Sequence, residues 1–269
     1  MSSFPTTTLL ATTYNRPKAL RALLLSVARQ TVRPDEIVIA DDGSTDETRQ
    51  LIDRMRPLLA PVPIRHVWHP DTGFRLSEIR NKAIAQSTGE YIIQIDGDIV
   101  LERHFMADHL ELTEPGWFVC GSRILLSEEQ TRHLEESTEA TPPRLWRCRI
   151  GCWPNGLRSR IGRGYLAKRY AKGKIKPLRG CNMAFWKTDL QAVNGYNEEL
   201  TNWGAEDLEI GYRLLRFGVR KKMLKMGGVE YHLYHPQAAR DALAQHKEII
   251  RQMSENGQVR CKEGIEKHL

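Results

Sequence analysis

Segments typical of buried strands alternate with amphipathic helical segments through the N-terminal half of this 269-residue chain. Apolar runs that predict strands lie at residues 7–12, 36–40, 64–68 and 90–95. The intervening segments predict helices that begin at Pro17 and that run over residues 46–55 and 76–87. Strands joined by helices in this way form a mostly parallel sheet with helices on its faces. The alternation therefore predicts an α/β, Rossmann-like fold.

Polar residues follow three of these strands. The sequences are TTYNR at residues 12–16, DDGSTD at 41–46 and DGD at 96–98. In open parallel sheets, ligands bind beyond the carboxyl ends of the strands. A solvent-exposed turn also explains DGD taken alone, because Asp and Gly favour turns. The agreement of three strand ends favours a binding site at that edge of the sheet.

The pair Asp96 and Asp98 has the spacing of a metal site. Two carboxylates just past a strand suit Mg²⁺ or Mn²⁺, which prefer oxygen ligands and share them with substrate phosphates. His232, in a strand predicted at residues 229–234, is a candidate third ligand that would favour Mn²⁺. His235 is equally available by residue type. A half-buried, hydrogen-bonded histidine is the alternative interpretation of His232.

A second acidic pair, Glu206-Asp207, opens the helix predicted at residues 206–217. Carboxylates at a helix N-terminus are favoured by the helix dipole, so an acidic first turn is one interpretation. Trp203 and Gly204, just before the pair, favour another, in which the aromatic ring forms a platform for a sugar and a carboxylate acts as general base. A base must lie within hydrogen-bond reach of the hydroxyl that it deprotonates.

Four side chains near the strand ends are candidates for contact with a nucleotide. Tyr14 could stack on a base, and Asp42 could accept a hydrogen bond from base or ribose. Arg75 and Arg80 could meet a diphosphate. The alternative for Tyr14 is an aromatic residue of the core or rim without a ligand, and the alternative for Arg75 and Arg80 is a solvated helix face. Because the chain has no GxGxxG or GxxxxGK[ST] phosphate loop, the charge of a diphosphate would fall mainly to a metal ion and side chains.

Positive charge is concentrated in residues 141–180, the basic insert. This segment holds eight Arg and four Lys without Asp or Glu, a charge of +12; the whole chain carries +7, which leaves −5 for the remainder. Gly and Pro interrupt it, so we expect a loop with short helices at most. The charge points to an anionic partner, either an acceptor or a membrane surface. A solvated flexible loop is the alternative.

The rest of the chain supports one main unit. Further strands are predicted at residues 117–121 and 181–186, and a helix from residue 237 to about 256. The N-terminus lacks the features of a secretory signal, and no apolar run approaches the ~18 residues of a membrane span. Five cysteines without a close CxxC pair are typical of a reduced protein. We therefore expect a cytoplasmic protein, at most peripheral at the inner face of the membrane.

Taken together, four motifs resemble family 2 glycosyltransferases of the GT-A fold. The motifs are TTYNRP, IADDGSTDET, RNKAIAQSTGEYIIQIDGD and GYNEELTNWGAEDLEIGYRL, and the resemblance covers about residues 6–236. The WGAEDLEIGYRL element is similar to the acceptor-side motif of chondroitin-polymerase-type and beta-galactosyltransferase-type enzymes. The resemblance implies a single GT-A domain at residues 1–236 and a helical tail at 237–269. The domain would comprise a nucleotide-binding half at about 1–122, the basic insert at about 141–180 and an acceptor-side half at about 181–236.

The resemblance also implies roles for individual residues. The residues that would bind the nucleotide sugar are Thr12, Tyr14, Arg16, Asp42, Arg75, Asp96 and Trp203. Tyr14 would stack on uracil, Asp42 would bind its edge, and Asp96 would lie near the ribose. Asp98 and His232 would hold the metal ion. Asp207 would be the catalytic base, with Glu206 beside it in the acceptor pocket.

The implied reaction is a single in-line displacement with inversion at the anomeric carbon. The donor would be UDP-Gal, UDP-GalNAc, UDP-GlcNAc or UDP-Glc, and Mn²⁺ or Mg²⁺ would offset the charge on the departing UDP. The acceptor would be a hydroxyl of an anionic glycan or lipid-linked glycan in surface polysaccharide or lipopolysaccharide synthesis. Chondroitin-type polymerases carry two transferase domains and this chain has room for one, so we expect addition of a single sugar.

Three other classes of function are compatible with parts of the sequence. A nucleotidyltransferase also uses paired carboxylates, but its basic Gly-rich loop is missing. A nucleic-acid-binding protein would explain Arg interleaved with Trp146, Trp153 and Tyr165; the acidic remainder argues against it, so we expect no nucleic-acid partner. A non-catalytic carbohydrate-binding relative is disfavoured because both acidic motifs and His232 are present. The sequence leaves the sugar, the linkage, the metal ion and the oligomeric state open.

Overall fold

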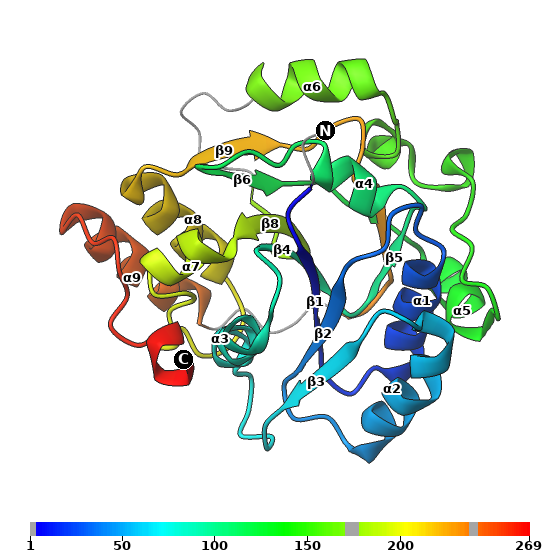
Figure 1. The fold of residues 1–269 in the computed structure, drawn as a ribbon, viewed down its shortest axis with the longest axis horizontal. Coiled ribbons are helices and arrows are strands. Elements are labelled where there is room, and N and C mark those ends of the chain that lie inside the picture. Colours follow the sequence, from blue (N-terminus) through cyan, green and yellow to red (C-terminus); the bar gives the residue numbers. More distant parts are fainter. Residues whose placement is uncertain (1–3, 170–177, 237–241) are drawn as a thin grey trace.

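The computed structural model describes residues 4–169, 178–236 and 242–269. Within these residues, a seven-stranded sheet and a three-stranded sheet are surrounded by helices (Figure 1). The strands are β1 (Thr7–Thr13), β2 (Glu36–Asp41), β3 (Ile64–Trp68), β4 (Tyr91–Asp96), β5 (Ile99–Leu101), β6 (Trp117–Cys120), β7 (Ile124–Leu125), β8 (Asn182–Trp186), β9 (Arg220–Met223) and β10 (Glu230–His232). The α-helices are α1 (Pro17–Ala28), α2 (Asp46–Leu59), α3 (Leu76–Gln86), α4 (Phe105–Leu110), α5 (Glu128–Glu136), α6 (Arg160–Arg169), α7 (Lys187–Ala192), α8 (Glu206–Phe217) and α9 (Leu243–Glu255). Short 3₁₀ helices are η1 (Leu145–Arg147), η2 (Ile150–Asn155) and η3 (Ile265–His268).

The large sheet is mostly parallel, as the sequence predicts. Its strand order is β3-β2-β1-β4-β8-β6-β9. Strands β1 to β4 run parallel to one another, β8 is antiparallel to both β4 and β6, and β9 is parallel to β6. The carboxyl ends of β1, β2 and β4 therefore meet at one edge of the sheet.

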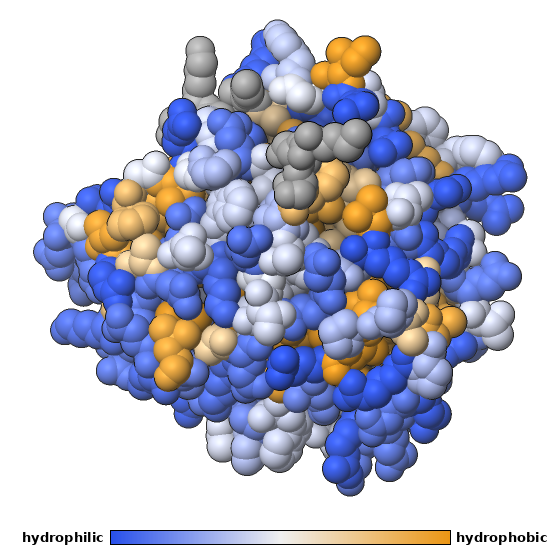
Figure 2. All heavy atoms as spheres, in the orientation of Figure 1, coloured by the Kyte–Doolittle hydropathy of each residue, from blue (hydrophilic) through white to orange (hydrophobic). Residues whose placement is uncertain are grey.

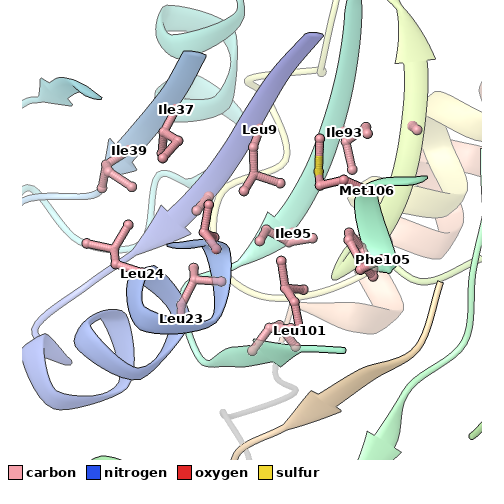
Figure 3. Close-up of a cluster of buried hydrophobic side chains, with 14 of the residues drawn as sticks. Leu9, Leu23, Leu24, Ile37, Ile39, Ile93, Ile95, Leu101, Phe105 and Met106 are labelled. Atoms are coloured by element: carbon pink, nitrogen blue, oxygen red, sulfur yellow. The ribbon is translucent and has the colours of Figure 1, made fainter. Parts of the chain in front are cut away.

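Helices cover both faces of this sheet (Figure 1). On one face, α1 and α2 pack on the strands; Figure 3 shows Leu23 and Leu24 of α1 on the same side of the sheet as Leu9, Ile93 and Ile95, in one buried cluster. On the other face, α3, α7 and α8 bury their apolar stripes against the alternate residues of the same strands. Each such leucine or isoleucine contributes roughly 1.5–3 kcal/mol by leaving water. Two apolar faces on each strand explain the near-continuous apolar runs in the sequence.

A small sheet brings two distant parts of the chain together. Its order is β5-β10-β7, with β10 antiparallel to β5 and parallel to β7. In this register His232 pairs with Ile99, the residue that follows Asp98. The Leu233 amide also donates to the Asp98 carbonyl oxygen at 2.9 Å. Strand pairing thus places a late histidine beside the DGD turn.

The basic insert is more ordered than the sequence predicts. It contains η1, η2 and α6, a ten-residue α-helix. The buried Arg163 of α6 forms ion pairs with Asp108 and Glu111 around α4, and Arg158 binds Asp108 as well. These tertiary contacts hold α6, which its glycines alone disfavour. Residues 170–177 of the insert lie outside the described residues.

The C-terminal segment packs against the main sheet. Helix α9 spans Leu243–Glu255, within the predicted tail helix, whose residues 237–241 lie outside the described part of the chain. Ile265 is fully buried in the core beside α3 and α7. None of the described helices has the length and apolar character needed to cross a bilayer. The face in Figure 2 is mostly hydrophilic, with apolar side chains in separate patches.

Candidate active site

The carboxyl ends of β1, β2 and β4 open into a cleft of about 1990 Å³. The loop before α8, the segment after β10 and η1 complete its walls. Every site residue predicted from the sequence lines this cleft except Arg75: the cleft-lining residues are Thr12, Tyr14, Arg16, Asp42, Asp96, Asp98, Trp203, Glu206, Asp207 and His232. His235 lines it as well.

The DGD turn is pressed against the end of β1. The Gly97 amide donates to the Thr12 carbonyl oxygen, and a Cβ at Gly97 would lie 2.7 Å from that same oxygen. Only glycine tolerates this approach. Thr12 pairs with Asp96 in the sheet, and its hydroxyl donates to Asp96 Oδ1 at 3.2 Å. The turn thereby directs both carboxylates into the cleft.

Asp98, His232 and His235 form a cluster with the geometry of a metal site. One ligand atom from each lies within 4.8 Å of the other two. His232 Nε2 is 3.7 Å from Asp98 Oδ1, and His235 Nε2 is 3.5 Å from Asp98 Oδ2. The sequence left open which histidine is the ligand, and the structure brings both to Asp98.

Hydrogen bonds on the far side of both rings fit this role. His232 Nδ1 is 2.9 Å from the Leu233 carbonyl oxygen, and His235 Nδ1 is 2.7 Å from that of Pro236. A carbonyl can only accept, so each Nδ1 carries the proton and a neutral ring keeps its lone pair on Nε2. Metal-binding histidines are oriented in this way. One carboxylate and two imidazoles suit Mn²⁺ better than Mg²⁺.

Arg16, at the start of α1, binds the same carboxylate. Its Nη1 donates to Asp98 Oδ2 at 2.8 Å, and its Nη2 donates to Glu135 and to the Tyr234 carbonyl oxygen. This contact places a cation next to the candidate metal ligands. Arg16 therefore provides positive charge beside the candidate metal site.

The two carboxylates that end β2 have different surroundings. Asp41 is fully buried and accepts from the Ser44 amide, whereas Asp42 lines the cleft. Asp42 accepts from the Arg75 amide at 3.0 Å and lies 2.7 Å from His69 Nε2. Burial raises the pKa of Asp42. Arg75 thus contributes its backbone, and its side chain lines a separate small pocket.

Tyr14 leaves its ring open to the cleft. The side chain is 49% exposed, and its hydroxyl donates to Asp71 Oδ2 at 2.8 Å. Asp71 is held close by Gly43, where a Cβ would lie 2.6 Å from the Asp71 Cα. Gly43 also has a φ of 98°, which favours glycine. The DDGS turn therefore supports the hydrogen bond that orients Tyr14.

Arg80 connects the two acidic motifs. It is 1% exposed, its Nη2 lies 3.3 Å from Asp96, and its Nη1 lies 3.6 Å from both Glu206 and Asp207. Its guanidinium also lies over the Tyr196 ring at 5.1 Å. The sequence suggested that Arg80 could meet a diphosphate; in the structure it binds carboxylates from both sides of the cleft instead.

The carboxylate of Asp207 has a pKa that is raised toward neutral pH. Burial, followed by the charge of Glu206, raises the pKa of Asp207 to about 7, and Arg80 opposes the rise. Its Oδ2 accepts from the Gly180 amide at 2.5 Å. The side chain keeps 23% of its surface open, toward the cleft. A base is most effective when its pKa lies near the working pH.

The loop that presents the acidic pair is strained and supported from behind. Asn202 and Ala205 have φ angles of 71° and 70°, a backbone region that costs a non-glycine residue roughly 1 kcal/mol. His246 of α9 lies 2.6 Å from the Gly204 carbonyl oxygen. Strain of this kind persists where surrounding structure enforces it. Sequence patterns miss His246 because it is forty-two residues from Gly204.

Comparisons with known proteins give the family of the chain. Residues 8–192 match the glycosyl transferase family 2 model, and residues 165–236 match the N-terminal domain of galactosyltransferase. Validoxylamine A glucosyltransferase of Streptomyces hygroscopicus subsp. limoneus is 27% identical over 81% of this chain and 49% of its own length. Chondroitin synthase of Escherichia coli is 26% identical over 83% of this chain and 34% of its own length. The chain thus spans about half or less of these curated relatives.

Solved structures share the fold. TarS of S. aureus superposes with a TM-score of 0.62 at 19% identity, over 93% of this chain and 40% of TarS. The mannosyltransferase PcManGT of Pyrobaculum calidifontis, solved with GDP-Man and Mn²⁺, superposes with a TM-score of 0.64 at 19% identity, over 93% of this chain and 65% of PcManGT. The fold and the matches define a glycosyltransferase with a GT-A architecture. The chain belongs to glycosyl transferase family 2, so the family predicted from the sequence motifs is confirmed.

Proposed function

We propose that this chain is an inverting, metal-dependent glycosyltransferase. It moves one sugar from a UDP-sugar to a hydroxyl of a glycan or glycolipid acceptor, in the cytoplasm and during surface polysaccharide or lipopolysaccharide synthesis. The observation that carries the proposal is that one cleft holds both acidic motifs. The Asp98 cluster and Asp207 line the same cleft, and Arg80 binds Asp96 of the DGD turn as well as Glu206 and Asp207.

The cluster of Asp98, His232 and His235 fits Mn²⁺ as the resident cation. Both histidines present Nε2 to Asp98 and are fixed through Nδ1. The cation would neutralise charge on the diphosphate leaving group. Relatives support a nucleotide donor, since TarS has been solved with UDP and PcManGT with GDP-Man and Mn²⁺.

Other residues of the cleft bind the donor and activate the acceptor. Tyr14 stacks on uracil, Asp42 binds its edge, and Asp96, held by Thr12 and Arg80, binds the ribose. Trp203 covers the sugar, and Arg16 meets the diphosphate. Asp207 removes the proton from the acceptor hydroxyl, which attacks the anomeric carbon from the face opposite to UDP. A single displacement of this kind inverts the anomeric configuration.

Glu206 and Arg80 set the state of the base. Glu206 places a second negative charge beside Asp207 and so makes it more basic, whereas Arg80 keeps it ionised near pH 7. The three groups together hold a carboxylate that can accept a proton at neutral pH and release it to solvent afterwards.

A nucleotidyltransferase would use the same nucleotide site with a phosphoryl acceptor. It would be expected to carry a basic Gly-rich loop near the first strand, which the sequence lacks, and the carboxylates of Glu206 and Asp207 would repel a phosphate nucleophile. The acidic pair therefore favours transfer to a hydroxyl.

The test is hydrolysis and binding of the donor. Release of UDP is measured over the four UDP-sugars with Mn²⁺ and with EDTA, and UDP binding is measured by calorimetry with Mn²⁺. We expect one donor to be hydrolysed slowly in a metal-dependent way, and Asp98→Ala to lose both hydrolysis and tight UDP binding. Absence of UDP binding by the wild-type protein in the presence of Mn²⁺ would refute the proposal.

A further inference from the structure

Four arginines of the basic insert line the cleft, and three of them lie close together in the sequence beside one tryptophan. We call these three and the tryptophan the arginine wall: Arg144, Trp146, Arg147 and Arg149. All four are exposed, and Trp146 is 63% exposed. Within the described residues, no carboxylate forms an ion pair with any of the three guanidinium groups. The wall therefore offers free positive charge to whatever enters the cleft.

Other arginines of the same insert are already engaged. Arg158 donates to both oxygens of the fully buried Asp108, and the buried Arg163 binds Asp108 and Glu111. These contacts fix α6 on the fold. The charge of the insert thus separates into a structural part and a part that faces the cleft.

The backbone of the wall is held in place. Gln130 Nε2 donates to the Arg147 carbonyl oxygen at 2.8 Å, and Gln130 belongs to the capping box that starts α5. Trp153 Nε1 donates to the Cys148 carbonyl oxygen at 3.0 Å. The Arg144 guanidinium lies over the Trp146 ring at 5.0 Å. A wall built in this way presents its charges at a defined place.

The donor does not require these charges. In the proposed function, a divalent cation held at Asp98 would neutralise the diphosphate together with the guanidinium of Arg16. The described part of α5 contributes one acidic residue to the cleft lining, Glu129. Glu135 of the same helix is paired with Arg16. Three arginines against one glutamate leave a net positive surface on this wall of the cleft.

We propose that the arginine wall binds oxyanion groups, phosphate or carboxylate, carried by the acceptor glycan. The proposal rests on the transferase function above and specifies its acceptor as anionic. The guanidinium forks match oxyanions in pairs of hydrogen bonds, and the Trp146 ring offers a face to the neighbouring sugar. The wall then holds the acceptor so that its hydroxyl reaches Asp207.

The experiment uses a matched pair of probes and a matched pair of variants. Protein saturated with UDP and Mn²⁺ is titrated with short dextran sulfate and with neutral dextran of equal length, the sulfates standing in for the oxyanions. The wall variant is Arg144→Ala/Arg147→Ala/Arg149→Ala. The control variant is Arg54→Ala/Arg65→Ala/Arg103→Ala, which removes the same charge from exposed positions outside the cleft.

We expect dextran sulfate to bind the wild type and neutral dextran not to bind. The affinity for dextran sulfate should fall about tenfold or more in the wall variant and less than about twofold in the control variant. The affinity for UDP should be unchanged in both variants. Equal weakening in both variants, or no binding of dextran sulfate to the wild type, would overturn the proposal. A loss of UDP affinity in the wall variant would assign the arginines to the donor instead.

Binding to vesicles of phosphatidylcholine with phosphatidylglycerol tests the alternative that the arginine wall binds a membrane surface. If the wall variant loses vesicle binding but keeps dextran sulfate binding, the wall serves a membrane surface and the acceptor proposal is wrong. A wild type that does not bind UDP with Mn²⁺ contradicts the transferase function. In that case the dextran sulfate titration is repeated without UDP, so that the arginine wall is tested separately from the transferase function.

Discussion

Neutralising Arg80 should move the pH dependence of catalysis. In Arg80→Met, Asp207 loses a cation whose Nη1 lies 3.6 Å from its Oδ1. Two charges at about this distance interact by about 4 kcal/mol at an effective dielectric constant of ~20. Arg80 is shared with Asp96 and Glu206, and Asp207 is partly open to solvent, so we expect about a third to two thirds of this value. That corresponds to a rise in the pKa of Asp207 of about one to two pH units, from a starting value of about 7.

The assay is the pH profile of kcat/KM with saturating Mn²⁺. Because Asp207 acts only when ionised, activity rises with pH through its pKa, and a higher pKa moves this acidic limb to higher pH. Arg80→Met should therefore be most impaired below pH 7 and should recover at about pH 9. Arg80→Lys keeps the charge, and Arg75→Met removes a charge outside the cleft, so both should retain the wild-type limb. An acidic limb in Arg80→Met that coincides with the wild type, or that moves to lower pH, would refute this role of Arg80.

Three further changes test the metal site, the base and the fold. Asp207→Asn should lower kcat by about 10²–10⁴-fold and leave UDP affinity with Mn²⁺ intact, as measured by calorimetry; a small loss of kcat would contradict its role as base. His235→Ala should raise the Mn²⁺ concentration that gives half-maximal activity by about tenfold or more, and an unchanged requirement would remove His235 from the site. Asp108→Ala leaves the buried Arg163 without its main partner and should cost about 3–5 kcal/mol in urea unfolding, whereas the exposed pair in Asp53→Ala should cost under about 1 kcal/mol.

The sequence predicted element bounds best where a single segment has a regular apolar pattern of its own. The segments 64–68 and 206–217 have the bounds predicted from periodicity, and the first four strands differ by one residue at most. The same strands end in the polar motifs, so the cleft-facing positions of Asp42, Asp96 and Asp98 follow from strand direction alone. A parallel strand buried on both faces leaves few other places for its polar residues.

Elements that depend on distant contacts were missed. Strands β5, β7 and β9 are two to four residues long, too short to carry a period, and they exist because a partner strand pairs with them. Helix α6 contains two glycines, and it forms because Arg163 reaches Asp108. Sequence periodicity holds no information on such pairings, which join residues more than fifty positions apart.

In the candidate site too, motifs identify the residues, whereas distant contacts determine their protonation and ligand sets. Motifs identify Asp98 and Asp207, but the protonation of Asp207 depends on Arg80, which lies in a helix whose sequence looks like an ordinary amphipathic segment. His235 resembles any exposed histidine until β10 pairs with β5 and brings it to Asp98. A motif states which chemical groups are present, whereas their pKa values and ligand sets arise from neighbours that the fold supplies. For this enzyme the buried Arg80 is that neighbour, since it lies between donor-side and acceptor-side carboxylates. A change at Arg80 should therefore alter the base and the ribose contact together, although neither Asp96 nor Asp207 has changed.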